Sequence, residues 1–549
     1  MSLGSSNIEP GDSKSLTKGL LDALAWGCVF LKRFWAECIL AIILLLAAAW
    51  FLSNLEGGLD HDEARYAVTG YCLFTGGRVV DLGVTNNPPL IKYFMGLSQF
   101  LLGRSSFAVR LPSAIFAILT LALAFYIGRE LWSPLTGLCS AAMLVSTFGF
   151  SRRAVAGLLD MGLTFFIILT CFILIKFKSK YYYYVLLGIA SGCVLSSKFT
   201  GLFALIPVVC YVLYSAFEDR SPKAALQFFL TAAATMLAVY LPYLSSIDLV
   251  VKSALHAASR QGTSLSYGVW TTMLLFLRET DSYNPLYALG ILASCLYLIF
   301  GGRNKKMLGL VGLSYYAGIH FMGMVHYRFI LALLPPFAIL AFGFVEEVSS
   351  SLLQQKPKFV SPKLPILIAL LIIIISPYGL LDWRGSPSVK PLNISLDTKA
   401  DQLASVIVKY SSRVYSRSGR RTIIVATQKH PSVLYYLGAD PIMYVQSPHS
   451  PNPPPNIYKT KVALTENTTV IMYWIGFDKN VDNEVYRLLV KGRVDILAIH
   501  NFNRLKQSVS GKRILNYIDA YCTKMDRLGA YRIYYMRGVK AGGRSEVSE

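Results

Sequence analysis

Residues 34–54 have the sequence FWAECILAIILLLAAAWFLSN, and residues 60–66, DHDEARY, follow after a short connection. The first stretch is apolar over nearly its whole length and is long enough to cross a bilayer, which takes roughly 17–25 residues. The second stretch carries three carboxylates within four residues. Together they predict a membrane-spanning helix with an acidic motif directly beyond its end.

The composition extends this interpretation to the whole chain. Hydrophobic residues make up 54% of the 549 residues and charged residues 15%, and the mean hydropathy is +0.47. A soluble domain carries about 25% charged residues. The net charge of +22 fits basic residues that flank membrane spans better than a nucleic-acid-binding surface, so we expect no nucleic-acid partner. None of the nine cysteines forms a CxxC pair, and no disulfide framework or zinc site is indicated.

Eleven apolar runs predict an α-helical polytopic membrane protein. The predicted spans are 34–54, 107–128, 134–150, 158–177, 181–196, 200–217, 225–244, 284–301, 307–324, 329–345 and 364–381. Short basic loops, such as the one that holds Arg303, Lys305 and Lys306, place the N-terminus inside. An odd number of spans then places the C-terminus outside. Both Asn-x-Ser/Thr sequons, at Asn393 and Asn467, follow the last span and agree with this orientation.

The hydropathy pattern of the sequence changes at about residue 383, from long apolar runs to short ones. Short apolar runs at 422–426, 441–445, 470–474 and 494–499 predict buried strands, and helical patterns lie between them. This alternation predicts an α/β layered domain. We therefore divide the chain into a membrane module, residues 1–382, and an extracytoplasmic α/β domain, residues 383–549.

The first outer loop, residues 55–106, is too long to be a simple connector, and loops of this length are usually functional. Acids at a helix start also suit the helix dipole, which offers a purely structural interpretation of Asp62 and Glu63. Arg65 and Tyr66 follow at once, however, so carboxylates and a cation share one helical turn. Asn87 begins an Asn-Pro-Pro-Leu segment in the same loop.

More ionisable and polar residues recur at the outer ends of other predicted spans, and residues of this kind near membrane depth indicate function by default. If these ends converge, they form a cavity with acids for proton transfer and cations for phosphate. The residues concerned are Arg153, Asp160, Lys198, His326, Tyr327 and Arg328.

In order and spacing, these motifs resemble the GT-C class of membrane glycosyltransferases, specifically the branch of protein O-mannosyltransferases and lipid A aminoarabinose transferases. The resemblance covers residues 60–201 and adds a weaker match at 326–329. Relatives place Lys or His before Pro-Pro-Leu, where this chain has Asn87. The motifs that carry the resemblance are Asp62-Glu-Ala-Arg-Tyr66, Asn87-Pro-Pro-Leu90, Ala108-Val-Arg-Leu-Pro-Ser-Ala114, Leu159-Asp-Met161 and Ser197-Lys-Phe-Thr-Gly201.

The resemblance implies an enzyme with the GT-C fold that moves a sugar from a polyprenyl-phosphate-linked donor to an acceptor hydroxyl, by a single inverting displacement. Asp62 would be the catalytic base, and Glu63 an orienting residue or alternative base. Arg65, Lys198 and Arg328 would bind the donor phosphate. Tyr66, Asn87, Arg153, Asp160, His326 and Tyr327 would bind substrate. No cofactor or metal is required by this mechanism.

The implied partners are the lipid donor, a glycan, lipid or protein acceptor, and the bilayer of the plasma membrane. Two alternatives stay open at this point. One is an oligosaccharyltransferase-like enzyme of the same fold, with a lipid-diphosphate donor and a metal. The other is a transporter or flippase, which usually has repeat symmetry and charges near the bilayer midplane. A structural or receptor-like membrane protein would explain the spans but not the ordered motifs.

Overall fold

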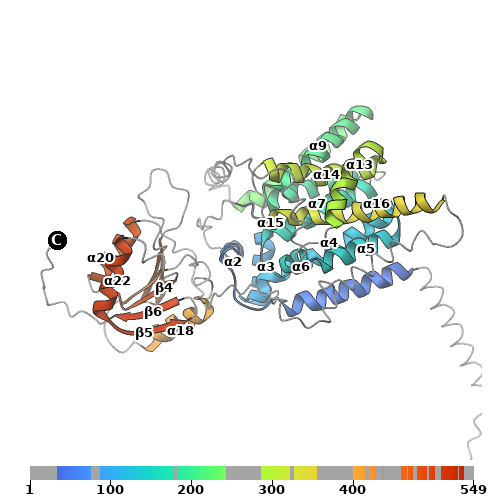
Figure 1. The fold of residues 1–549 in the computed structure, drawn as a ribbon. Coiled ribbons are helices and arrows are strands. Elements are labelled where there is room, and N and C mark those ends of the chain that lie inside the picture. Colours follow the sequence, from blue (N-terminus) through green and yellow to red (C-terminus); the bar gives the residue numbers. More distant parts are fainter. Residues whose placement is uncertain are drawn as a thin grey trace, which may run out of the picture.

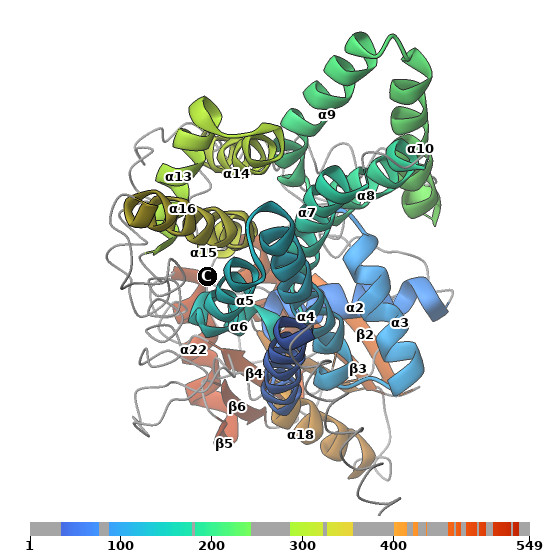
Figure 2. The ribbon, with the colours of Figure 1, turned by 90° about the vertical axis from the view of Figure 1, so that its right-hand side faces the viewer.

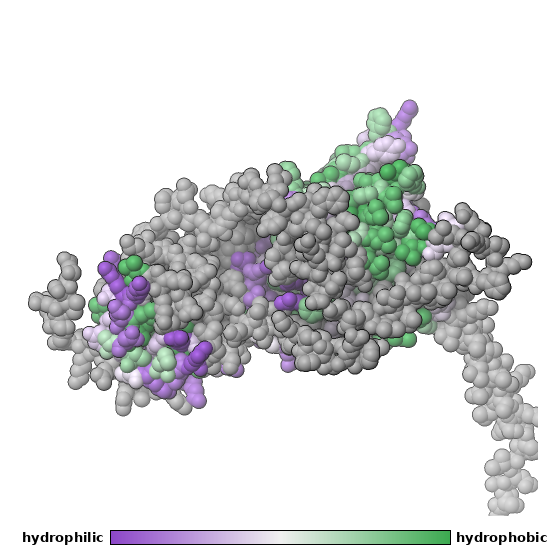
Figure 3. Space-filling model, in the orientation of Figure 1, coloured by the Kyte–Doolittle hydropathy of each residue, from purple (hydrophilic) through white to green (hydrophobic). Residues whose placement is uncertain are grey.

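The structure is a computed structural model that describes residues 34–75, 87–177, 182–242, 286–321, 327–354, 400–413 and shorter segments between 421 and 536. Most of the described residues form one helical bundle, and a mixed β-sheet follows it in the sequence (Figure 1). On the described surface, hydrophobic residues gather over the bundle, whereas the sheet region shows many hydrophilic ones (Figure 3).

The bundle begins with the helix Phe34–Ser53. Further helices up to residue 240 are α2 (His61–Thr75), α3 (Leu90–Leu102), α4 (Ser106–Leu131), α5 (Pro134–Ser146), α6 (Phe148–Ala154), α7 (Leu159–Lys176), α8 (Tyr183–Ser197), α9 (Gly201–Glu218) and α10 (Pro222–Tyr240). The bundle continues with α13 (Leu286–Phe300), α14 (Arg303–Phe321), α15 (Tyr327–Ile330), the 3₁₀ turn η3 (Leu331–Leu333) and α16 (Leu334–Gln354). Helices α9 and α10 form a hairpin at one edge of the bundle (Figure 2), with α10 packed against α8 and α9 against α14.

The described residues of every predicted span from 34–54 to 329–345 lie in one helix or in consecutive helical segments. Among the described residues, six helices are long and apolar enough to cross a membrane, or seven if one bent pair counts as a single span. A polytopic helical membrane protein is thereby confirmed. The predicted span 364–381 lies outside the described residues, so the count of eleven stays a prediction.

The span predicted at 134–150 is not one straight helix. The chain bends by 72° between α5 and α6, and Thr147, between them, has an extended backbone with φ −78° and ψ 113°. The Thr147 hydroxyl donates to the Met143 carbonyl at 2.7 Å, which satisfies a carbonyl at the helix end. Arg153, on α6, interacts electrostatically with Asp160 in the first turn of α7.

Helices α2 and α3 pack with their backbones in close contact. A Cβ added at Gly70 would lie 2.2 Å from the Lys92 carbonyl oxygen, and one added at Gly96 would lie 2.1 Å from the Gly70 carbonyl oxygen. Only glycine permits this approach at both positions. The contact fixes the Asp62 helix against the Asn87 segment.

The sheet has the strand order β2-β3-β1-β4-β6-β5. Parallel pairs join β1 to β3 and β4, and antiparallel pairs add β2, β6 and β5 at the two sides. The strands are β1 (Arg421–Ala426), β2 (Lys459–Thr465), β3 (Thr468–Tyr473), β4 (Ile496–His500), β5 (Cys522–Leu528) and β6 (Tyr531–Met536).

Helices cover both faces of this sheet, which makes three layers. Strand β4 alternates between the two faces, as a pleated strand must. Ile496 and Ala498 join the apolar cluster of α18 (Ala400–Arg413), while Leu497 and Ile499 join that of α20 (Lys479–Val490) and α22 (Val509–Tyr521). The predicted boundary at 383 lies outside the described residues, so the division into two domains stays a prediction.

The α18 cluster extends into the bundle. Ala64 and Val68 of α2 are fully buried together with Leu403 of α18 and Val425 of β1. Helix α2 lies between the bundle and the sheet in Figure 1. The helix that carries the acidic motif is therefore packed on both of these parts of the molecule.

Candidate functional site

A chain of ion pairs joins four segments that lie far apart in the sequence. Arg328 of α15 donates from Nη1 to Oδ2 of Asp62, in the first turn of α2, at 2.7 Å. The Arg328 Nε lies 3.6 Å from Oδ2 of Asp160, in the first turn of α7. Lys198, between α8 and α9, donates to Oδ1 of Asp160 at 2.6 Å. The Arg328 guanidinium thus lies between the carboxylates of Asp62 and Asp160, and Lys198 forms a second ion pair with Asp160.

Two further cations lie around this chain. The Nη2 of Arg65 is 3.6 Å from Oδ1 of Asp62, on the next turn of the same helix. Arg153, which is 5% exposed, acts electrostatically on Asp160. The structure therefore brings the three residues predicted to bind phosphate, Arg65, Lys198 and Arg328, into one cluster with both acids.

The two acids differ in exposure. The Asp62 side chain is 25% exposed, whereas that of Asp160 is 3% exposed. A base that takes a proton from a substrate must be within hydrogen-bond reach of it, and of these two acids Asp62 is the more accessible from outside. Asp160 is enclosed by its cations, so its geometry suits the bracing of Lys198 and Arg328.

Glu63 has a different environment from Asp62. It is 1% exposed and forms a two-point ion pair with Arg110 of α4, from Nε to Oε1 and from Nη2 to Oε2, both at 2.9 Å. Its oxygens also accept from the Gly157 and Asp60 backbone amides, at 2.7 and 2.8 Å. Four donors occupy this carboxylate, so the predicted role of alternative base does not fit. The predicted role of orienting residue does.

Arg110 is the residue that the sequence-based site prediction missed. Besides Glu63 it donates to the carbonyls of Leu55, Glu56 and Gly58, at 3.1, 3.1 and 2.8 Å. The buried Arg110–Glu63 pair thereby fixes the connection between the first span and α2. The sequence feature that could have identified Arg110 is its position within an apolar helix, because a buried Arg requires a carboxylate partner.

Tyr66, Asn87 and Lys92 form a second small network next to the ion pairs. Asn87 Nδ2 donates to the Tyr66 hydroxyl at 3.2 Å. Lys92 Nζ donates to the Asn87 carbonyl at 2.8 Å and lies 5.6 Å from the Tyr66 ring centroid. Burial raises the pKa of Tyr66, which keeps its hydroxyl protonated at physiological pH. Lys92 is fully buried, so a cation stands near Asn87 although position 87 itself has none.

The remaining predicted site residues, His326 and Tyr327, lie at the boundary between residues that the structure does not describe and the start of α15. His326 is outside the described residues. Tyr327 starts α15, directly before Arg328. Within the described part of the chain, no group of three or more His, Cys, Asp or Glu side chains could hold a metal ion.

Comparison with known proteins gives a family match over about a third of the chain. Residues 79–261 match the model of the PMT family, dolichyl-phosphate-mannose-protein mannosyltransferase. The resemblance to protein O-mannosyltransferases and aminoarabinose transferases is confirmed. The PMT match includes Asn87, Arg153, Asp160 and Lys198, while the Asp62 motif and Arg328 lie outside it.

A curated relative is the undecaprenyl phosphate-alpha-4-amino-4-deoxy-L-arabinose arabinosyl transferase of Pseudomonas aeruginosa. It is 31% identical over 196 residues, which are 32% of this chain. The match spans 35% of the relative's length, about a third.

Two solved structures share the fold over nearly the whole chain. ArnT from Cupriavidus metallidurans, in its structure bound to undecaprenyl phosphate, aligns with a TM-score of 0.59 at 14% identity and covers 93% of this chain and 99% of ArnT. The oligosaccharyltransferase AglB from Archaeoglobus fulgidus, solved with an inhibitory peptide and a dolichol-phosphate, aligns with a TM-score of 0.52 at 13% identity. That alignment covers 92% of this chain and 75% of AglB. The predicted GT-C fold is thus confirmed.

Proposed function

We propose that this protein is a membrane glycosyltransferase that moves a sugar from a polyprenyl-phosphate-linked donor to an acceptor hydroxyl. The observation that carries the proposal is the gathering of cations in the ion-pair cluster. Among the described residues, Arg65, Arg153, Lys198 and Arg328 lie around the carboxylates of Asp62 and Asp160. Several cations from separate elements at one place suit an anionic ligand, and a phosphate monoester carries up to two negative charges.

The reaction makes use of these cations. When the bond between the anomeric carbon and the phosphate oxygen breaks, the leaving polyprenyl phosphate gains one negative charge. Cations already fixed in place stabilise developing charge without reorganising. The guanidinium of Arg328 is suited to phosphate because its planar fork can donate along two parallel hydrogen bonds.

Asp62 would take the proton of the acceptor hydroxyl as the acceptor oxygen bonds to the anomeric carbon. Attack opposite the leaving phosphate inverts the configuration at that carbon. The products are the glycosylated acceptor, free polyprenyl phosphate and a protonated Asp62, which then releases its proton to water. Glu63 and Arg110 would position Asp62 without contacting substrate.

The finer assignments belong to the same proposal. The relatives named above act on or bind undecaprenyl and dolichyl phosphates, and either lipid class is compatible with the cluster. We place the protein in the plasma membrane, with the cluster and residues 383–549 on the outer side. The metal-dependent oligosaccharyltransferase alternative and the transporter alternative find no supporting observation among the described residues.

A transfer assay tests the proposal. Membranes that contain the full chain are incubated with a panel of polyprenyl-phosphate sugars, and products are identified by mass spectrometry. We expect one donor to be consumed, with inversion visible by NMR of the product, and Asp62→Asn membranes to serve as the inactive control. Equal donor turnover in both membranes would refute the proposal.

Topology is tested separately. In a background without the native cysteines, a single cysteine replaces either Lys306 or Lys524, and an impermeant thiol reagent is added to intact cells. We expect labelling at 524 only. Labelling of both positions would contradict the orientation.

A further inference from the structure

A second charged site lies at the far end of the bundle from Asp62. A pocket of about 190 Å³ is lined by residues of α13, α14 and α16. Helix α16 runs from α15 toward the end of the bundle away from α2 (Figure 1). At about 1.5 Å of rise per residue, Glu347 lies roughly 25–30 Å from Arg328. This is close to the hydrocarbon thickness of about 30 Å, so the pocket lies at the opposite membrane boundary.

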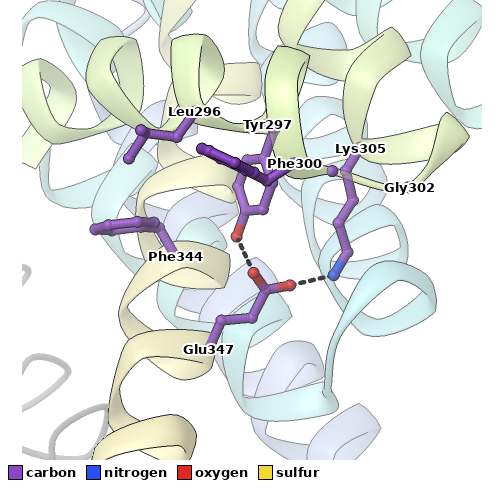
Figure 4. A pocket seen from close by; sticks show the side chains of 8 residues that line it. Leu296, Tyr297, Phe300, Gly302, Lys305, Phe344 and Glu347 are labelled. Carbon is purple, nitrogen blue, oxygen red and sulfur yellow. Dashed lines mark hydrogen bonds and ion pairs between the residues drawn. The ribbon is translucent and has the colours of Figure 1, made fainter.

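The polar wall of the pocket is firmly fixed. Glu347 accepts from Trp132 Nε1 at 2.8 Å, from the Tyr297 hydroxyl at 3.0 Å and from Lys305. Lys305 Nζ also lies 4.7 and 5.7 Å from the ring centroids of Trp132 and Tyr297. Figure 4 shows Glu347 pointing between Tyr297 and Lys305. These contacts hold one cation and one anion side by side.

Both charged groups keep capacity for a ligand. A carboxylate has about four acceptor positions and an ammonium has three donors, whereas the described contacts use three positions on Glu347 and one donor of Lys305. The side chains of Lys305 and Glu347 are 24% and 41% exposed, so a ligand can reach them.

The opposite wall is apolar. Leu296, Phe300 and Phe344 line it (Figure 4). Phe300 is 80% exposed and its neighbour Ile299 is 67% exposed, so the apolar wall continues onto the lipid-facing surface of α13. A ligand of this pocket therefore has a zwitterionic head and an apolar tail.

We propose that the pocket binds an aminophospholipid, phosphatidylethanolamine, from the leaflet opposite the ion-pair cluster. A phosphate oxygen accepts from Lys305 Nζ, the primary ammonium donates to Glu347, and an acyl chain lies along Phe300 and Ile299. Phosphatidylcholine has no N–H to donate to Glu347, and phosphatidylglycerol has no cation to pair with it. The site thus selects for a headgroup that carries both a phosphate and an N–H donor.

Lipid binding to the purified full chain tests this inference. Native mass spectrometry measures the dissociation constants of phosphatidylethanolamine, phosphatidylglycerol and phosphatidylcholine with matched acyl chains. We expect phosphatidylethanolamine to bind about tenfold more tightly than the other two, the value of one charge-assisted hydrogen bond. Glu347→Gln should abolish this preference, and Lys305→Gln should weaken binding of all three lipids.

Two variants separate binding from folding. A Cβ at Gly302, which lines the pocket, would meet no atom within 4 Å, so Gly302→Leu fills space and leaves the polar contacts intact. We expect it to remove lipid binding at an unchanged melting temperature. Lys306→Gln removes the neighbouring charge outside the pocket lining and should bind lipid like the unmodified chain. Equal affinity for the three lipids, or unchanged binding by Gly302→Leu, would overturn the proposal.

Discussion

Arg328 Nη1 lies 2.7 Å from Asp62 Oδ2, across 266 positions of sequence. The pair joins the start of α15 to the start of α2, and the same guanidinium also faces Asp160. A neighbouring guanidinium favours the ionised form of a carboxylate. The contact therefore keeps the proposed base ready to accept a proton and places a phosphate-binding group directly beside it.

Asp62→Asn should reduce transfer by about 10²–10⁴-fold, the usual contribution of a general base. The substitution nearly preserves shape, so the melting temperature and donor binding should change little. Turnover with saturating donor is the measurement. Asp60→Asn is the matched control and should be milder, because Asp60 contributes its backbone amide to Glu63. If Asp60→Asn abolished transfer while Asp62→Asn retained it, the base would be Asp60.

Arg328→Lys keeps the charge but loses the planar fork that reaches both Asp62 and Asp160. We expect kcat/KM for the donor to fall by about 10–100-fold, because a misplaced catalytic group of this kind costs up to about 10²-fold. Arg303→Lys provides the control, since Arg303 forms its ion pair with Glu218. Should Arg328→Lys transfer at the normal rate, a simple positive charge would suffice at this position.

Glu63→Gln separates a positioning role from a catalytic one. It removes the charge that faces the buried Arg110, and breaking a buried pair costs about 3–5 kcal/mol. The melting temperature should therefore fall along with activity, unlike that of Asp62→Asn. Thermal unfolding of the detergent-solubilised chain measures this difference. An unchanged melting temperature with transfer abolished would instead assign Glu63 to the chemistry.

Lys92→Met tests the network at Asn87. Without the ammonium, the Asn87 carbonyl and the face of Tyr66 lose a buried partner. We expect transfer to fall about tenfold, mainly through a higher KM for the donor. Tyr66→Phe removes the hydroxyl that accepts from Asn87 and should cost only about 2–10-fold. Assays over a range of donor concentrations distinguish KM from kcat, and a larger effect of Tyr66→Phe would mean that its hydroxyl contacts substrate.

The helices could be predicted from sequence because apolar length alone specifies a membrane span. Strand β5 (Cys522–Leu528) could not be predicted in this way, because its sequence, CTKMDRL, contains no run of apolar residues. The site residues were predicted from their position at span ends. The pairing of Arg110 with Glu63 rather than with Asp62 could not be predicted. Adjacent residues on a helix point about 100° apart, and only the packing of α4 against α2 decides which of the two carboxylates faces Arg110.

Helix α2 shares one apolar cluster with α18 and the sheet and its backbone touches α3 at Gly70. Helix α2 is thus in contact with the sheet and with the bundle at the same time. A tilt of the sheet would turn it and swing Asp62 relative to Arg328, which is anchored elsewhere in the bundle. A change in the position of the sheet would therefore alter the distance between the two partners of this ion pair without any rearrangement of the membrane helices.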